Sequence, residues 1–161
     1  MRKQILGSDP AAPVSSHDEL DVASLATVMI TSESPEHPVE NTFDGHRGSG
    51  ASRWIAATPG EQTLILAFDV PQRIGRVLVE VEETQDSRTQ ELQLAVSRDG
   101  GRGYQELVRQ EFNFSPPNTT LEREDWAIAG EAITHLRLWI KPDKGGRPCR
   151  ATLTSLALKP E

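Results

Sequence analysis

The stretch Pro38-Val39-Glu40-Asn41-Thr42-Phe43-Asp44-Gly45 contains an Asn-x-x-Asp-Gly turn, which is the strongest local signal in the sequence. An Asp side chain accepts hydrogen bonds from nearby backbone groups, and Gly adopts a positive φ without steric cost. Asp44-Gly45 therefore predicts a tight turn. A segment rich in small residues follows and ends at Ser52-Arg53-Trp54, where a series of alternating segments begins.

Beyond Trp54, apolar and polar residues alternate with a period of two, which is typical of β-strands with one buried face. Leu64, Leu66 and Phe68 share one face of the clearest example. No segment has sustained helical periodicity, and turn residues such as Asp-Gly and Gly-Gly separate the strands. Strands are expected at about 26–31, 64–68, 77–82, 92–97, 126–128, 135–141 and 151–158. Many short strands in one domain predict an all-β sandwich or barrel.

Composition limits the class of protein. The 161 residues fit one folded domain over 21–161, preceded by a flexible arm over 1–20. The 24 acidic and 17 basic residues give a net charge of −7, which argues against broad binding to nucleic acid or to anionic membranes. Cys149 is the one cysteine, so no internal disulfide can form. Because the N-terminus lacks the apolar run of a signal peptide, a bacterial cytoplasmic location is expected.

The sequence holds no motif of an established catalytic mechanism. A Gly-x-Ser-x-Gly elbow, a phosphate-binding Gly-Lys-Ser/Thr loop and a Gly-x-Gly-x-x-Gly turn are all absent. The 4 histidines have no metal-ligand spacing. These patterns therefore give little support to an enzyme.

The order of these motifs resembles that of the discoidin family (F5/8 type C, galactose-binding-like) over roughly 22–158. This resemblance implies a jelly-roll β-sandwich used as a noncatalytic binding module, in which Trp54 anchors the first loop to the core. The matching landmarks are Asn41…Asp44-Gly45, Ser52-Arg53-Trp54, Gln62 with 64–68, Val70-Pro71…Ile74…Val77, Ser97-Arg98-Asp99-Gly100…Tyr104 and 134–138.

The resemblance also implies a structural Ca²⁺ at the first loop. Carried over, its ligands are Asp44 and, in the position of a family Thr, Ser52. The family's C-terminal Glu corresponds to Ser155, a neutral residue, although Ca²⁺ prefers 6–8 oxygen ligands with more than one carboxylate. The alternative is that Asp44 caps the turn beside Gly45 by accepting backbone N–H groups.

Ligands of this family are implied to bind among the loop tips at one end of the sandwich. The candidates here are His46, Arg47 and Arg53 of the first loop, with Arg147 of the late loop. Their charge would suit a carbohydrate or another small polar or anionic ligand. The alternative is a solvated loop without a specific ligand. The first loop, 45–53, contains no pair of large apolar residues, which argues against membrane insertion.

A second surface is predicted around Trp139. By alternation it lies opposite Leu138 and Ile140, on the same polar strand face as His135 and Arg137. An exposed aromatic there would form a contact or dimer surface, unless the arm or a loop at 112–114 covers it. This surface favours a second function, an intracellular protein-interaction or scaffold domain.

Overall fold

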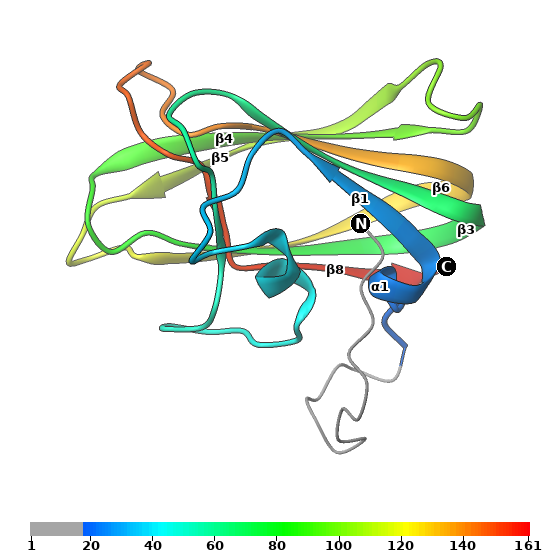
Figure 1. The fold of residues 1–161 in the computed structure, drawn as a ribbon, viewed down its shortest axis with the longest axis horizontal. Helices are drawn as coiled ribbons and strands as arrows, with labels where there is room; N and C mark the ends of the chain where they lie inside the picture. The colour runs from blue at the N-terminus through cyan, green and yellow to red at the C-terminus, as the bar shows by residue number, and fades with distance from the viewer. Residues whose placement is uncertain (1–17) are drawn as a thin grey trace.

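The computed structural model describes residues 18–161, which form a β-sandwich with very little helix (Figure 1). The short helices are α1 (Val22–Leu25) and the 3₁₀ helix η1 (Val39–Phe43). The strands are β1 (Ala26–Ile30), β2 (Trp54–Ile55), β3 (Gln62–Glu82), β4 (Arg88–Ser97), β5 (Gln105–Phe114), β6 (Leu121–Lys141), β7 (Thr152–Leu153) and β8 (Ser155–Pro160).

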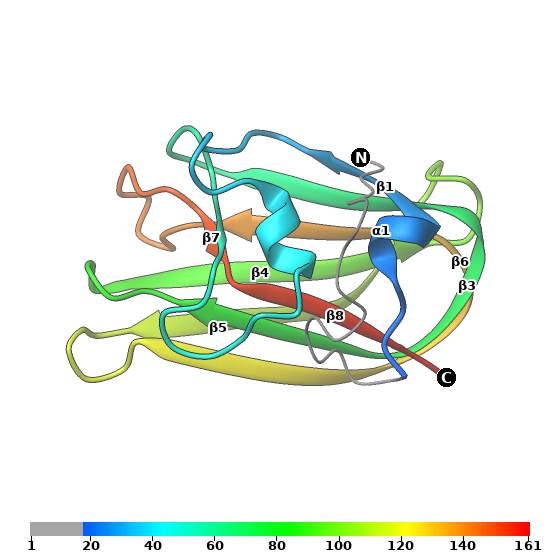
Figure 2. The same ribbon diagram turned by 60° about the horizontal axis from the view of Figure 1, so that its bottom comes forward.

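The main sheet is antiparallel and has the order β1-β3-β6-β4-β5, while β8 pairs with β3 and a small second sheet joins β2 to β7. The strands β3 and β6, of 21 residues each, take part in both layers. The first half of β3 pairs with β1 and its second half pairs with β8. Both strands curve round at the end of the molecule where the C-terminus lies (Figures 1 and 2).

This curvature depends on irregular pairing and on a glycine. The register between β3 and β6 shifts three times between Ala67 and Arg76. Gly130 faces this bend, and a Cβ there would lie 2.1 Å from the carbonyl oxygen of Ile74. Since only glycine lacks a Cβ, the two long strands can approach closely at this point. The all-β jelly-roll prediction is confirmed.

The core lies between the two layers and follows the predicted alternation. Leu64, Leu66, Leu136 and Leu138 are almost fully buried. Trp54 is 1% exposed, and its indole Nε1 donates a hydrogen bond to the carbonyl oxygen of Ser32 at 2.9 Å. The predicted role of the tryptophan as the anchor of the first loop is therefore confirmed.

Two local expectations differ from the structure. Residues 112–114 end β5 instead of forming a loop, and both Phe112 and Phe114 are buried. The preceding residues, Gln105 to Glu111, do not alternate regularly between apolar and polar, because charged or amide side chains occur on both faces of the strand. The sequence pattern therefore did not predict β5. Likewise, the segment 126–128 is not a separate strand but the middle of β6.

The N-terminal segment is described only from residue 18. Leu20 donates its N–H to the carbonyl oxygen of Leu158 at 2.8 Å, and Lys159 pairs with Asp18 at 3.7 Å. Residues 18–20 of the expected arm thus lie against β8, while 1–17 are outside the described residues. Across 18–161 we find no helix with the length and hydropathy needed to span a membrane.

Candidate functional site

A cleft of about 450 Å³ opens at the loop end of the sandwich, opposite the bend of β3 and β6. Its walls come from four places in the sequence: the segment between β1 and η1 at His37, the end of the first loop, the turn between β3 and β4, and the late loop before β7. The lining residues are His37, Arg53, Ile55, Glu82, Glu83, Thr84, Gln85, Asp86, Arg88, Pro148, Cys149, Arg150 and Thr152.

The guanidinium of Arg53 forms one wall and is held rigidly. It donates to the carbonyl oxygens of Glu82 and Ala51, at 3.1 and 3.3 Å, and forms an ion pair with the Glu82 carboxylate. Glu82 is 1% exposed. Because its charge is compensated by a buried carboxylate, Arg53 contributes a fixed shape to the cleft more than a free positive charge.

Arg88 holds the opposite wall. Its Nη1 donates to the carbonyl oxygens of Pro142 and Arg150, each at 2.9 Å, so one side chain ties the two ends of the late loop together. Its Nε lies 2.7 Å from the carboxylate of Glu83. The two groups form an ion pair, but they are not aligned for a hydrogen bond. The side chain is 2% exposed, so this network belongs to the frame of the cleft.

Arg150, His37 and Asp86 are among the cleft side chains that remain available to a ligand. Arg150 is exposed, and no carboxylate within residues 18–161 pairs with it. His37 is half-buried, and its backbone, not its ring, makes the contacts with Ser34 and Ile55. The cleft therefore presents a guanidinium, an imidazole and the exposed carboxylate of Asp86 on a frame of neutralised ion pairs.

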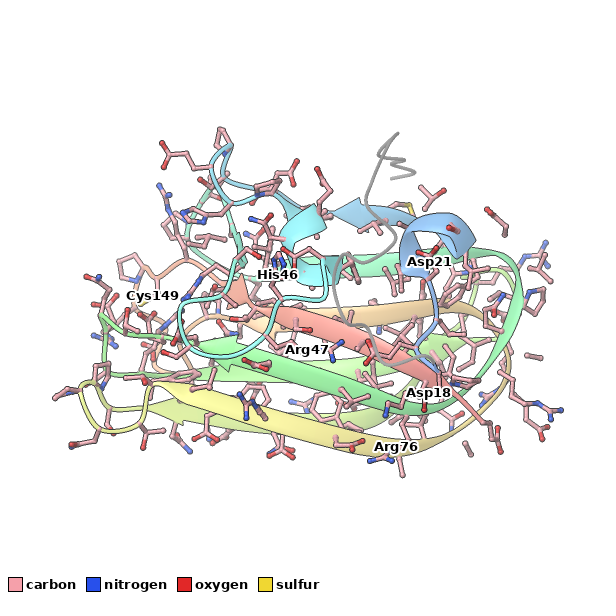
Figure 3. All side chains as sticks on the ribbon, turned by 90° about the horizontal axis from the view of Figure 1, so that it is seen from below. Asp18, Asp21, His46, Arg47, Arg76 and Cys149 are labelled. Carbon is pink, nitrogen blue, oxygen red and sulfur yellow. The ribbon has the colours of Figure 1, made fainter. Side chains whose placement is uncertain are left out.

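The four predicted ligand-binding residues are not brought together. Arg53 lines the cleft, and Arg147 lies beside it, donating to the carbonyl oxygen of Ser87 and pairing with Asp143 at 3.1 Å. His46 and Arg47 lie on the flank, near β8 and away from Cys149 (Figure 3).

On that flank, Arg47 lines a separate cavity of about 330 Å³. Its Nη1 donates to Glu19 at 3.0 Å, its Nη2 binds the other oxygen of the same carboxylate, and its Nε donates to the Ser155 hydroxyl at 3.2 Å. His46 Nδ1 lies 3.5 Å from Asp44. Each of the four predicted residues therefore has a carboxylate neighbour, which removes the electropositive group that the sequence led us to expect.

The implied calcium ligands form a turn cap. Asp44 Oδ1 accepts the N–H of His46 at 2.8 Å, and Oδ2 accepts the hydroxyl of Ser52. Gly45 has a φ of 79°, as the Asp-Gly turn requires. Within 18–161 no three His, Cys, Asp or Glu side chains form a group suited to a metal. Asp44 is the one carboxylate among these residues, and the neutral Ser155 accepts a hydrogen bond from Arg47, so they lack the second carboxylate that Ca²⁺ prefers and do not fit a calcium site.

Sequence reasoning missed Glu82, Glu83, Arg88 and His37 as parts of the cleft. Glu82 carries no local signal, because Glu80 and Glu82 alternate with Val79 and Val81 as residues on the solvent face of a strand do. Arg88 and His37 have no local pattern that distinguishes them from solvated residues. Only the folded topology brings them together.

The second predicted surface lies on the outward face of the main sheet. Trp139 is half-buried between Thr63 and Gln93, and its Nε1 donates to Glu61 at 3.0 Å. The guanidinium of Arg137 lies 4.2 Å from the centre of the Tyr104 ring. His135 packs against the turn at Gly101. The 112–114 segment does not cover this face, because its aromatic residues point into the core.

Comparison with known proteins establishes the fold class. No family model matches the sequence, and no curated protein matches it. Solved structures do match, with family 32 carbohydrate-binding modules prominent among them. The fold is therefore that of the galactose-binding-like, discoidin-type β-sandwich, as its motifs predicted.

Three of these structures cover nearly the whole domain. A module from a family 31 glycoside hydrolase of Clostridium perfringens has a TM-score of 0.66 at 15% identity, covering 91% of this chain and 97% of that one. The AlyQ module in complex with 4,5-unsaturated mannuronic acid has a TM-score of 0.62 at 18% identity, covering 88% and 98%. The C. perfringens NanJ module in complex with galactose has a TM-score of 0.61 at 12% identity, covering 88% and 97%.

Proposed function

We propose that this protein is a noncatalytic carbohydrate-binding module whose ligand occupies the loop-end cleft. The observation that carries the proposal is the cleft itself, where Arg150 and His37 stand on a frame held by the Arg53–Glu82 and Arg88–Glu83 ion pairs. The likeness to carbohydrate-binding modules, two of them solved with galactose and an unsaturated mannuronic acid, supports the same function.

The chemistry of the cleft suits a saccharide. Sugar hydroxyls both donate and accept hydrogen bonds, and this cleft offers guanidinium donors, carboxylate and carbonyl acceptors, and the apolar side chains of Ile55 and Pro148. The free charge of Arg150 favours a sugar that carries a carboxylate, since a guanidinium binds a carboxylate through two parallel hydrogen bonds. We therefore propose a uronic acid, or an oligosaccharide that contains one.

The cleft is not built for proton transfer. Glu82 accepts hydrogen bonds from the loop and from Arg53, and Glu83 accepts the N–H groups of Gln85 and Asp86 at 2.9 and 3.4 Å. Carboxylates engaged in this way cannot readily act as general acid or base. This supports a binding function without turnover.

Titration calorimetry with galacturonate, mannuronate oligomers and galactose tests the proposal. Arg150→Ala should weaken uronate binding by about tenfold or more, the equivalent of one lost charge-assisted pair. Arg102→Ala, which removes the same charge from the exposed turn between β4 and β5, is the matched control and should leave affinity unchanged. Absence of binding to any saccharide, in calorimetry and on a glycan array, would refute the function.

A second candidate function rests on the outward sheet face. Met29 of β1 is 44% exposed and pairs in register with Ile65 of β3. Strand β3 in turn pairs with β6, which carries Trp139. Such a face supports a scaffold that binds a protein, for which the simplest partner is a second copy of the chain. Sedimentation analysis decides: a dimer that Trp139→Ala converts to monomer supports it, and a monomer at all concentrations counts against it. A cytoplasmic, bacterial setting remains a prediction.

A further inference from the structure

The loop between Gly45 and Trp54 directs hydrogen-bond donors inward, toward two buried carboxylates. Gly48 donates its N–H to Glu80, and Gly50 donates its N–H to Glu82 at 3.0 Å. The hydroxyl of Ser49 donates to the other oxygen of Glu82 at 2.7 Å. Both glutamates belong to β3 and are only 4% and 1% exposed.

This polarity is the reverse of that found in a loop that binds a cation. A Ca²⁺ loop turns carbonyl and carboxylate oxygens toward one centre. Here the N–H groups of Gly48 and Gly50 face the carboxylates of Glu80 and Glu82, an orientation that favours negative charge. Both oxygens of Glu82 accept hydrogen bonds from these donors and from Arg53, so the carboxylate faces N–H and O–H groups and a guanidinium instead of a metal.

The partners of Glu82 favour its ionised form. Burial disfavours its charge, but the N–H of Gly50, the Ser49 hydroxyl and the Arg53 guanidinium together hold the pKa of Glu82 below its ordinary value. At neutral pH Glu82 thus acts as a negative charge around which the loop is arranged.

Positive charge is supplied by side chains at both sides of the loop. Arg53 pairs with Glu82, and the Nε of Arg123 lies 3.3 Å from Glu80. The guanidinium of Arg47 donates a hydrogen bond to the hydroxyl of Ser155. In the family that the sequence resembles, a glutamate ligand of the cation occupies the position of Ser155. A tethered guanidinium therefore lies where that ligand would be required.

We propose that these built-in charges take the place of a bound divalent cation: Glu80 and Glu82 order the first loop, Arg123 and Arg53 supply the positive charge that balances them, and the domain folds and works without metal. The inference concerns the loop and does not depend on the nature of the ligand. Removal of a metal should therefore change neither the fold nor the loop, whereas removal of Glu82 should release the loop.

The first test compares melting of the full chain in millimolar chelator and in millimolar CaCl₂. The two melting temperatures should coincide, and calorimetric titration with Ca²⁺ should give no binding heat. A lower melting temperature in chelator, or stoichiometric Ca²⁺ binding, would overturn the proposal.

The second test uses Glu82→Gln, which keeps the size of the side chain and removes its charge. Limited proteolysis should reveal new cleavage within 45–53, and added CaCl₂ should not suppress it. Glu36→Gln, at an exposed acid ahead of the loop, is the control and should resist cleavage as the wild type does. If Glu82→Gln does not fold, Ser49→Ala removes one of the loop contacts and serves in its place.

A variant that stays resistant to protease, or whose resistance Ca²⁺ restores, would contradict the inference. These readouts involve no saccharide. A failure here would therefore leave the proposed ligand cleft untouched, and a chain that binds no saccharide would leave this inference untouched.

Discussion

Arg53 and Glu82 form an ion pair that belongs to two features of the molecule at once. The carboxylate accepts hydrogen bonds from Ser49 and Gly50 and so holds the first loop, while the guanidinium lines the loop-end cleft. Any change to this pair should therefore alter both the stability of the domain and the shape of the cleft.

Replacing Arg53 by Ala should destabilise the domain by about 3 kcal/mol, because Glu82 would be left as an uncompensated buried charge. Urea unfolding measures this change. Arg109→Ala is the control: Arg109 also pairs with a glutamate, but its side chain is 55% exposed, so the cost should stay below about 1 kcal/mol. Equal costs for the two variants would show that burial of the Arg53–Glu82 pair has no energetic importance.

Replacing Arg88 by Lys should loosen the late loop while keeping the charge. A lysine carries a single ammonium group on a flexible stem, so it cannot hold the carbonyls of Pro142 and Arg150 with one nitrogen and pair with Glu83 through another, as Arg88 does. We expect faster hydrogen exchange across 143–149 and weaker ligand binding, since Arg150 loses its fixed position. Unchanged exchange in this loop would mean that other contacts hold it in place.

The sequence predicted the fold well because the fold depends on local patterns. The alternation of Leu64, Leu66 and Phe68, and the turn at Asp44-Gly45, are each written in neighbouring residues and are both present in the structure. Where polar side chains occupied both faces, as in β5, the same reasoning did not find the strand.

The site could be predicted only in part, because it depends on contacts between distant residues. Arg47 and Arg53 are six positions apart in the sequence, yet one pairs with Glu19 on the flank and the other with Glu82 beside the cleft. A count of positive residues in a loop does not reveal which of them already have a carboxylate partner. Burial of Glu80 and Glu82 could be inferred only once the first loop was seen to fold over β3.

The two tryptophans Trp54 and Trp139 should respond differently to the same substitution. Trp54→Phe should destabilise the domain by about 1–2 kcal/mol, because it leaves the buried carbonyl of Ser32 without its donor and opens a small cavity. Trp139→Phe removes a bond to the exposed side chain of Glu61 and should change stability by less than about 0.5 kcal/mol. Chemical denaturation of both variants measures the difference, and a larger effect at Trp139 would show that this ring is covered in solution.

The free energy of unfolding should fall at acidic pH, because Glu82 and Asp143 lose their negative charges there. Burial disfavours the charge of each, but hydrogen-bond donors hold both pKa values below ordinary, through Gly50, Ser49 and Arg53 for Glu82 and through Arg147 and Thr89 for Asp143. A carboxyl whose pKa is lowered by folding stabilises the folded state fully above its unfolded pKa, which is about 4, and loses that contribution as the pH falls through the folded pKa.

The melting temperature should therefore be flat from neutral pH to about pH 5 and then decline. In Glu82→Gln the melting temperature should be lower at neutral pH, and its distance from the wild type should shrink below pH 4, because protonation makes the two side chains equivalent in charge. A gap that stays constant from pH 7 to pH 2 would show that the charge of Glu82 contributes nothing to folding, and that the first loop is held by packing alone.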